Sequence, residues 1–254
     1  MTEQTESRAV LVTGASRGIG RAIARAFAAQ GDRVAVHHGS SRDAAERVVA
    51  ELAGDGHVVV QADMADAEAV GRMVDDAAAA LGGLQVLVNN AGVFTAHPPL
   101  TTSWEDWQEL VTRTLAVNLV GAMHATFRAV PHLVAAGGGA VVNVTSRGAF
   151  RGEPNTPAYG ASKAGLNAFG QSMAQALAPQ GITVGSVAPG FVQTEMAREV
   201  LDGPSGDAVR AQSPYGRVAR PEEVASAVLW LASPGARFST GTIIDVNGAS
   251  YLRS

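Results

Sequence analysis

A tyrosine and a lysine four residues apart could form an acid–base pair in this sequence. Tyr159 and Lys163 come just after Pro157, which favours the first turn of a helix, and side chains at positions i and i+4 share one face of a helix. A free phenol has a pKa of about 10, and a neighbouring ammonium group lowers it by favouring the phenolate. Such a pair could move a proton at neutral pH. The same spacing also arises by chance, where a surface lysine packs over a half-buried tyrosine.

Ser146 could add a hydrogen-bond donor to this pair. It follows the apolar run Gly139–Thr145 and lies thirteen residues before Tyr159. Ligands of open α/β sheets bind beyond the carboxyl ends of the strands. A serine at such an end, a tyrosine on the following helix and an anion-binding turn after the first strand would therefore converge on one cleft.

A glycine-rich turn, Gly14-Ala15-Ser16-Arg17-Gly18-Ile19-Gly20, follows the first apolar run. Glycines permit a tight turn and a close approach of backbone to a pyrophosphate, and the helix that follows offers free N–H groups and a partial positive charge to that anion. The spacing Gly-x-x-x-Gly-x-Gly differs from the Gly-x-Gly-x-x-Gly of the long-chain dehydrogenases. In its strand–turn–helix context, the turn predicts dinucleotide binding.

The same turn leaves one alternative to weigh. Residues 14–18 also fit Gly-x-Ser-x-Gly, the nucleophile elbow of α/β-hydrolases. That class needs an acid and then a histidine later in the chain, and the last histidine here is His132. An elbow on the very first strand also leaves too little sheet before it, so the hydrolase interpretation is disfavoured.

The segment after the second predicted strand selects the nucleotide. NAD sites usually carry Asp or Glu about 20 residues after the glycine turn, to bind the ribose 2′-hydroxyl. Here residues 36–42 read Val-His-His-Gly-Ser-Ser-Arg, with no carboxylate. Arg17 and Arg42 could pair with a 2′-phosphate, and Ser40 and Ser41 could donate hydrogen bonds to it. We therefore predict NADP in preference to NAD, although Arg42 alone reads as a solvated residue in the first turn of a helix.

Short apolar runs alternate with longer Ala-rich segments along nearly the whole chain. Runs such as Val86-Leu87-Val88 are continuously apolar, as expected for strands buried on both faces of a parallel sheet. This alternation predicts an α/β fold: a single-domain, Rossmann-type, doubly wound parallel sheet of about seven strands flanked by helices. Strands are predicted at Ala9–Thr13, Arg33–His37, His57–Gln61, Gln85–Asn89, Gly139–Thr145, Ile182–Val187 and Thr242–Val246, and helices near 18–31, 42–53, 66–82, 104–136, 157–178 and 220–232.

Two segments interrupt the alternation. Residues 93–103 contain Pro98-Pro99 and predict a loop, and residues 190–219 contain several Gly and Pro between short helical stretches. A long irregular segment in a compact domain is often an active-site lid, so we expect a substrate lid at about 190–219. A plain surface excursion is the alternative. We expect one domain over residues 8–254, preceded by a disordered tail over residues 1–7.

The composition excludes several classes of protein. The 254 residues include no Cys, which rules out disulfides, thiol catalysis and Cys-based zinc sites, and we expect no metal site. A formal charge of −4 argues against nucleic-acid binding, which usually needs a basic stripe. The polar start does not read as a signal peptide, and no run of about 18 apolar residues could span a membrane. We expect a cytoplasmic protein with no nucleic-acid or membrane partner.

Taken in order, these pieces resemble the short-chain dehydrogenase/reductase family, in its branch of about 250 residues. Each motif is weak alone, but the set is specific and spans residues 8–250. The matching pieces are Thr13 to Gly20, Asp63, Asn89 to Gly92, Asn118, Ser146, Tyr159 with Lys163, Pro189 and Gly190 with Thr194, and Gly241 to Gly248.

The resemblance implies roles for these residues. Tyr159 would protonate the carbonyl oxygen as hydride arrives, and Ser146 would hydrogen-bond that oxygen. Lys163 would lower the Tyr159 pKa and hold the nicotinamide ribose, and Asn118 would kink its helix and hold a relay water. Without the resemblance, Asn118 could be a buried amide whose hydrogen bonds are all made within the protein, and Asp63 could cap a helix. The implied cofactor contacts are Gly14, Ser16, Arg17, Gly18, Ile19, Gly20, His38, Ser40, Ser41, Arg42, Asp63 (near the adenine), Met64, Asn90 (near its ribose), Ala91, Gly92, Tyr159, Lys163, and Pro189, Gly190, Val192 and Thr194 around the carboxamide.

Within the family, the chain most resembles the 3-oxoacyl-acyl-carrier-protein reductases, through residues 216–218 and 246–248 and the missing acid after the second strand. We therefore predict NADPH-dependent, reversible reduction of a carbonyl to a secondary alcohol, with a small-molecule or 3-oxoacyl thioester substrate. The alternative is a non-catalytic NADP-binding sensor or scaffold. An intact set of Ser, Tyr, Lys and Asn argues against that alternative, because a pure binder does not need it.

Other features bear on substrate and assembly. Residues 135–139 and 178–181 lack the basic side chains that often dock the acyl carrier. Arg147, Arg151 and Arg198 could form a different basic rim, or they could be ordinary solvated charges. The aromatic side chains that we expect to face the substrate are Phe94, Phe150, Phe191 and Tyr215. We expect a homotetramer or a dimer formed through 104–136 and 157–178, with tight intramolecular packing as the alternative.

Overall fold

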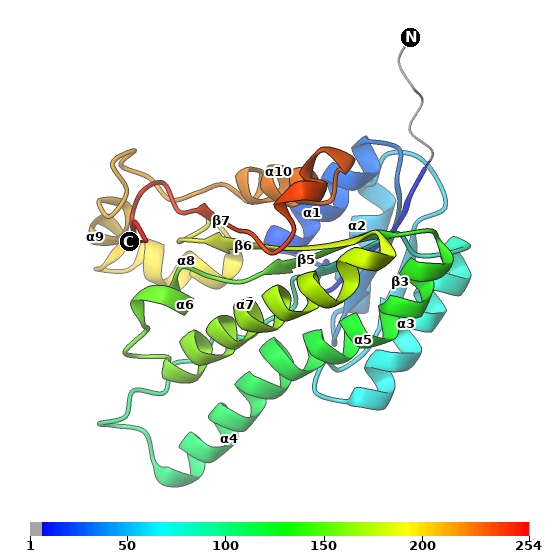
Figure 1. Ribbon diagram of the computed structural model, residues 1–254. Coiled ribbons are helices and arrows are strands. Elements are labelled where there is room, and N and C mark those ends of the chain that lie inside the picture. Colours follow the sequence, from blue (N-terminus) through cyan, green and yellow to red (C-terminus); the bar gives the residue numbers. More distant parts are fainter. Residues whose placement is uncertain (1–6, 254) are drawn as a thin grey trace.

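The centre of the protein is one parallel sheet of seven strands in the order β3-β2-β1-β4-β5-β6-β7 (Figure 1). The structure is a computed structural model that describes residues 7–253. Of the expected tail, residues 1–6 lie outside the described residues. The predicted fold class is confirmed, and the strands lie where the apolar runs placed them. They are β1 (Ala9–Val12), β2 (Arg33–His38), β3 (Val58–Gln61), β4 (Val86–Asn89), β5 (Gly139–Val144), β6 (Ile182–Pro189) and β7 (Ile243–Val246).

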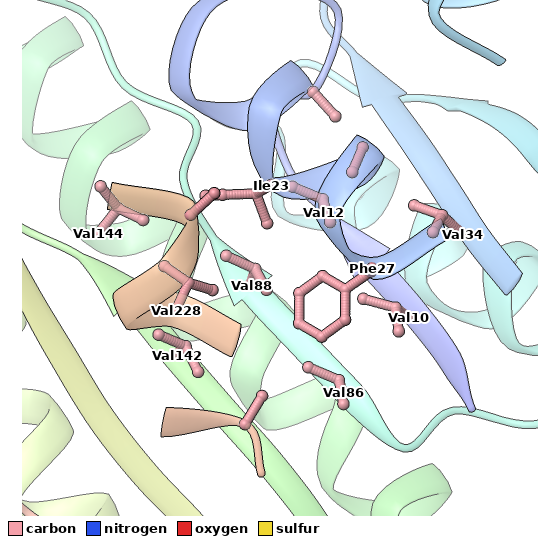
Figure 2. Packing of buried hydrophobic residues seen from close by; sticks show 14 of the residues in the cluster. Val10, Val12, Ile23, Phe27, Val34, Val86, Val88, Val142, Val144 and Val228 are labelled. Carbon is pink, nitrogen blue, oxygen red and sulfur yellow. The ribbon is translucent and has the colours of Figure 1, made fainter. Parts of the chain in front are cut away.

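The inner strands bury both of their faces, because alternate side chains point to opposite sides of the sheet, whereas the edge strands β3 and β7 are partly exposed. In β1, Val10 and Val12 pack into one core cluster, and Ala9 and Leu11 pack into the other. Figure 2 shows the first cluster, in which Phe27 of a covering helix lies against valines of several strands.

Helices cover the two faces in separate groups (Figure 1). The face with Val10 and Val12 carries α1 (Gly18–Ala29), α2 (Arg42–Glu51) and α10 (Pro221–Leu231). The opposite face carries α3 (Ala67–Leu81), α4 (Trp104–Leu115), α5 (Gly121–Ala135) and α7 (Pro157–Leu177). Within residues 7–253, no helix is both long and apolar enough to cross a membrane.

The single helix predicted over 104–136 is wrong in one respect. A π-helical turn, η1 (Ala116–Val120), separates α4 from α5. Asn118 lies in this turn, where its Oδ1 accepts a hydrogen bond from the Val93 N–H at 2.7 Å and its Nδ2 donates to the Val93 carbonyl at 3.0 Å. Such turns are rare and often occur at functional sites. Here the side chain holds the loop that follows β4.

Short helices gather at the carboxyl ends of the strands (Figure 1). They are α6 (Gly148–Arg151) after β5, and α8 (Glu195–Asp202) and α9 (Gly206–Arg210) within the segment 190–219. A single parallel bridge, Val192 with Ala219, ties the two ends of that segment together. The remaining short helices are η2 (Ala178–Gln180) and η3 (Pro234–Ser239).

Candidate active site

A cleft of about 400 Å³ opens at the carboxyl ends of the strands, where the strand order reverses around β1 and β4. Most of the predicted site residues line it, although they come from distant parts of the chain. They are Gly14, Ser16, Arg17, Gly18, Ile19, Gly20, Ser40, Ser41, Asp63, Met64, Asn90, Ala91, Gly92, Ser146, Tyr159, Lys163, Pro189, Gly190, Val192 and Thr194. Among the described residues that were predicted, only His38, Arg42 and Asn118 do not line this cleft.

Tyr159 and Lys163 lie on the first turns of α7, beside the end of β5. The Lys163 ammonium group is buried and donates a hydrogen bond to the Val144 carbonyl oxygen at 2.8 Å. Its Nζ atom lies 5.8 Å from the centre of the Tyr159 ring. Ser146, two residues after Val144, lines the same end of the cleft. The three side chains that the sequence proposed for catalysis therefore lie together.

The protonation of this group differs from the sequence prediction. Burial raises the pKa of Tyr159, the Ser146 hydroxyl partly opposes that shift, and the charge of Glu153 adds to it. The net shift is therefore opposite to the expected lowering, because the ammonium group is directed to the Val144 carbonyl and burial is the largest cause; the role of Lys163 stays a prediction. Burial also lowers the pKa of Lys163, to about 8. At neutral pH the phenol keeps its proton, as a proton donor must.

Asn118 supports the site from behind its wall. A Cβ at Gly92 would lie 3.3 Å from the Asn118 Oδ1 and 3.5 Å from the Lys163 Nζ, so the amide is next to the lysine. Its Nδ2 also contacts the Ser162 hydroxyl at 3.3 Å. The predicted residue is therefore close to the others without lining the cleft.

The glycine turn is fixed by side chains of its neighbours. The Gly14 N–H donates to His37 Nδ1 at 2.9 Å, and Asn90 Nδ2 donates to the carbonyl oxygens of Thr13 and Gly14 at 2.8 and 3.1 Å. A Cβ at Gly20 would lie 2.3 Å from the Gly14 carbonyl oxygen, so only glycine fits there. The turn leaves the first N–H groups of α1 facing the cleft, which suits an anion.

His37 is a site residue that the sequence prediction missed. It lines the cleft, and its second ring nitrogen contacts the Ala62 carbonyl oxygen at 3.1 Å. Burial lowers the pKa of His37 to about 4, so the ring is neutral and can accept at one nitrogen and donate at the other. The available signal was the alternation of β2, which directs adjacent side chains to opposite faces of the sheet.

The end of the cleft near β2 differs in part from the prediction. Ser40, Ser41 and Arg17 line it, but Arg42 does not, because its side chain runs along α2 to an ion pair with Glu46 at 2.8 Å. The predicted contacts of Arg42 and His38 with a cofactor are therefore not supported by this geometry. His38 is buried, and its Nδ1 has no partner among the described residues.

Asp63 pairs with another residue that the sequence prediction missed. Its carboxylate lies 2.9 Å from Arg113 of α4, which holds the pKa of Asp63 below its ordinary value, and both line the cleft. The helix cap considered for Asp63 belongs instead to Asp66, whose carboxylate accepts the Ala69 N–H at 3.0 Å. Within residues 7–253, no group of three or more His, Asp or Glu side chains is arranged to hold a metal ion.

Two of the four aromatic side chains expected at the substrate lie there. Phe94 packs edge-on against Tyr159, with ring centres 4.8 Å apart, and Phe191 lines the same space. Phe150 lies instead beneath the Arg253 guanidinium, 4.5 Å from the ring centre. Tyr215 is 76% exposed and belongs to a neighbouring cavity.

A protein-family model described as enoyl-(acyl carrier protein) reductase matches residues 14–249. The chain is also 36% identical over 248 residues to the 3-oxoacyl-[acyl-carrier-protein] reductase FabG of Staphylococcus aureus, which covers 97% of this chain and 99% of that protein. The chain belongs to the short-chain dehydrogenase/reductase family. It is therefore an NAD(P)-dependent oxidoreductase.

Other members of the short-chain dehydrogenase/reductase family support the same assignment. The D-threitol dehydrogenase of Mycolicibacterium smegmatis is 37% identical over 250 residues, which cover 98% of this chain and 94% of that protein. A short chain dehydrogenase from Burkholderia cenocepacia, solved in complex with NADP, superposes with a TM-score of 0.86 at 36% identity over 96% of this chain and 97% of that chain. The first of these acts on a sugar alcohol, so family membership alone leaves the substrate open.

Replacement of Gly20 by alanine is expected to weaken binding of the nicotinamide nucleotide at least about tenfold, or about 1.4 kcal/mol. The added Cβ would collide with the Gly14 carbonyl oxygen and displace the turn. Gly71→Ala is the matched control, because a Cβ there meets nothing within 4 Å. Fluorescence titration with NADPH measures both affinities, and equal affinities in the two variants would contradict this account of the turn.

The buried Lys163 is expected to make stability depend on pH between about 8 and 10 in the absence of cofactor. Its folded-state pKa of about 8 lies below the unfolded value of about 10.4. The unfolded chain therefore holds more protons in this window, and the free energy of unfolding rises with pH by about 1 kcal/mol per pH unit. Denaturant unfolding of wild type and Lys163→Met measures the rise as the difference between them. Parallel curves would exclude it.

Proposed function

We propose that the protein reduces a carbonyl to a secondary alcohol with NADPH, reversibly, and that its substrate is a 3-oxoacyl thioester. The observation that carries this proposal is the meeting of Ser146, Tyr159 and Lys163 at one end of the cleft, with the glycine turn along its wall. When bound, the reduced nicotinamide supplies the hydride. The catalytic and cofactor-binding roles of the individual residues are part of this proposal.

Ser146 and Tyr159 would act on the carbonyl oxygen of the substrate in different ways. Negative charge develops on that oxygen during reduction, and the Ser146 hydroxyl can donate a hydrogen bond to it. Tyr159 supplies the proton, which its raised pKa keeps in place until the oxygen becomes basic. Lys163 is a cation close to the ring, and Asn118 positions the loop at Val93.

The cleft fits a dinucleotide phosphate on three observations. The N–H groups of α1 face it, the cradle at Gly14 and Gly20 admits no Cβ, and Ser40, Ser41 and Arg17 surround its far end. Arg17 is exposed and supplies a cation where NAD sites carry an acid. The relative from Burkholderia cenocepacia is a complex with NADP. We propose NADP in preference to NAD on these grounds.

Two observations support a thioester substrate: the names of the similar proteins and the side chains that line the substrate end of the cleft. Reductases named for 3-oxoacyl carrier substrates match 97% of the chain. Phe94, Phe191, Met196 and Val200 give the substrate end an apolar wall that suits an acyl chain. Since Met196 and Val200 belong to α8, we propose that the segment 190–219 is the substrate lid. Of the three arginines considered for docking an acyl carrier, Arg151 and Arg198 are exposed, whereas Arg147 is buried.

Assembly into a homotetramer is a further part of the proposal. The outer faces of α4, η1 and α5 expose large apolar side chains, and a second group lies near the C-terminus. The first group is Trp104, Val120, Met123, Phe127 and Val134, and the second is Trp230, Phe238 and Leu252. On α7, Ala161, Ala164 and Ala168 are exposed and small enough for close approach of another helix. A cytoplasmic location stays a prediction.

Tyr159→Phe is expected to lower the turnover number with an acetoacetyl thioester at least about 100-fold, because general acid catalysis contributes about 10²–10⁴-fold. NADPH affinity should change little, since the ring and its packing against Phe94 remain. Loss of absorbance at the reduced-nicotinamide band measures turnover, and fluorescence titration measures binding. Full turnover in the variant would refute the mechanism, and no turnover by wild type with any carbonyl would favour the sensor alternative.

Arg17→Ala is expected to raise the KM for NADPH about tenfold or more, since a charged hydrogen bond contributes about 1.5–3 kcal/mol. The KM for NADH should stay within about twofold, because that cofactor has no 2′-phosphate. Arg42→Ala serves as the control, because Arg42 is paired with Glu46 outside the cleft. A similar rise for both cofactors in Arg17→Ala would contradict a phosphate-binding role.

A further inference from the structure

Arg147 is a buried cation next to the proposed catalytic serine. It follows Ser146 directly, and its side chain is only 3% exposed. It lines the substrate end of the main cleft and also a neighbouring cavity of about 130 Å³, which shares Phe191 with the cleft. Arg147 was expected only on an exposed basic rim, which its burial excludes.

The hydrogen-bond partners of Arg147 are neutral. Its Nη1 donates to the Ser250 hydroxyl and its Nη2 donates to the Gln212 Oε1 at 2.6 Å. The Phe191 ring covers one face of the guanidinium group at 5.3 Å. Within residues 7–253, no carboxylate lies within 4 Å of Arg147, and its Nε has no hydrogen-bond acceptor.

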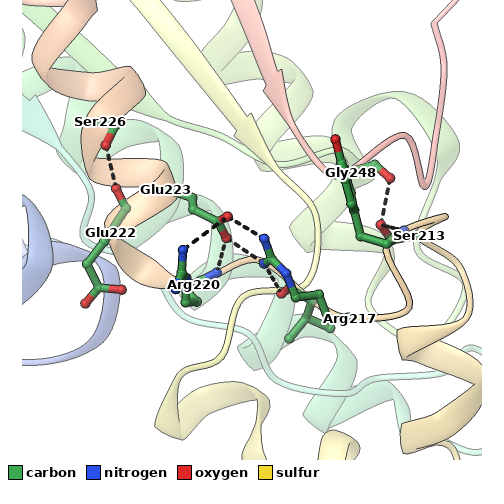
Figure 3. A network of polar contacts seen from close by, with 9 residues as sticks. Ser213, Arg217, Arg220, Glu222, Glu223, Ser226 and Gly248 are labelled. Carbon is green, nitrogen blue, oxygen red and sulfur yellow. Dashed lines mark hydrogen bonds and ion pairs between the residues drawn. The ribbon is translucent and has the colours of Figure 1, made fainter.

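The carboxylates near this arginine are already paired with other arginines. Glu153 lies 3.8 Å from Arg151. In the neighbouring cavity Glu223 forms two hydrogen bonds with Arg217, as Figure 3 shows. Charge in that region is thus balanced in pairs, apart from Arg147.

A buried charge is costly unless it is paired, and neutral acceptors compensate it only in part. Burial lowers the pKa of Arg147 to about 10, which still leaves the group charged at neutral pH. An arginine fork matches a carboxylate in shape and charge. Ser146 and Arg147 both line the main cleft, so a small molecule at Ser146 lies in the same space as Arg147.

We propose that Arg147 is a specificity-determining residue that binds a carboxylate of the substrate, a few bonds from the reacting carbonyl. The inference rests on the proposed carbonyl reduction and adds oxo acids as a second substrate class beside the 3-oxoacyl thioesters. A neutral 3-oxoacyl thioester has only a carbonyl oxygen where an oxo acid has its carboxylate. The two substrate classes therefore differ in charge next to Arg147 and can be separated by experiment. The carboxylate accepts from guanidinium N–H groups that Ser250 and Gln212 leave free, among them that of Nε.

The test compares acetoacetate with methyl acetoacetate, which have the same carbon skeleton around the reacting carbonyl but differ in charge. With saturating NADPH, wild type should show a kcat/KM at least about tenfold higher for the acid, through a lower KM. Arg147→Met should lose that preference, with at least a tenfold loss on the acid and at most a threefold change on the ester. Arg147→Lys should recover part of the preference, because it restores the charge.

Arg47→Gln is the matched control, since Arg47 is exposed on α2 and does not line the cleft. It should leave the preference for the acid unchanged. An equal loss on both substrates in Arg147→Met would assign Arg147 a structural role and overturn the proposal. If that variant fails to fold, the wild-type ratio and the lysine variant still decide: a wild type that prefers the methyl ester to the acid overturns the proposal while leaving carbonyl reduction intact. No turnover of any carbonyl would overturn the proposed function and this inference with it.

Discussion

The cleft depends on a junction between two loops, one after β1 and one after β4. Thr13 Oγ1 accepts hydrogen bonds from the Asn90 and Ala91 N–H groups at 2.9 and 3.0 Å, and the Asn90 amide donates back to the first loop. These strands flank the point where the sheet reverses its order, and the loops that follow them lead to helices on opposite faces of the sheet. The junction therefore fixes the glycine turn on one side and the loop to Val93 on the other.

Three basic side chains are buried around the cleft, and each is held in a different way. His37 is neutral and bridges two backbone groups. Lys163 has a single backbone acceptor at Val144 and a pKa of about 8. Arg147 stays charged and is held by neutral acceptors. Because an incompletely paired charge in a dry site interacts strongly with a ligand, Lys163 and Arg147 would favour an anionic or polar group in the cleft.

The expected elements could be read from the sequence because their signals are local. Continuous apolar runs such as 86–88 predict buried parallel strands, and the glycine turn predicts its own strand–turn–helix context. The π turn at 116–120 has no signal in the apolar pattern, which predicted one continuous helix; a kink at Asn118 was implied only by the family resemblance. In the structure Asn118 bonds to Val93, twenty-five residues away.

The sequence by itself determined the fold class and which motif follows which strand. It also determined the meeting of Ser146, Tyr159 and Lys163, because parallel strands all end at the same edge of the sheet. Only the tertiary structure decided the electrostatics. Whether Arg42 reaches the cleft or pairs with Glu46 depends on where α2 points, and the burial of Arg147 depends on segments that lie far from it in the chain. The pKa values of buried groups likewise follow from desolvation by the whole fold, which no short motif encodes.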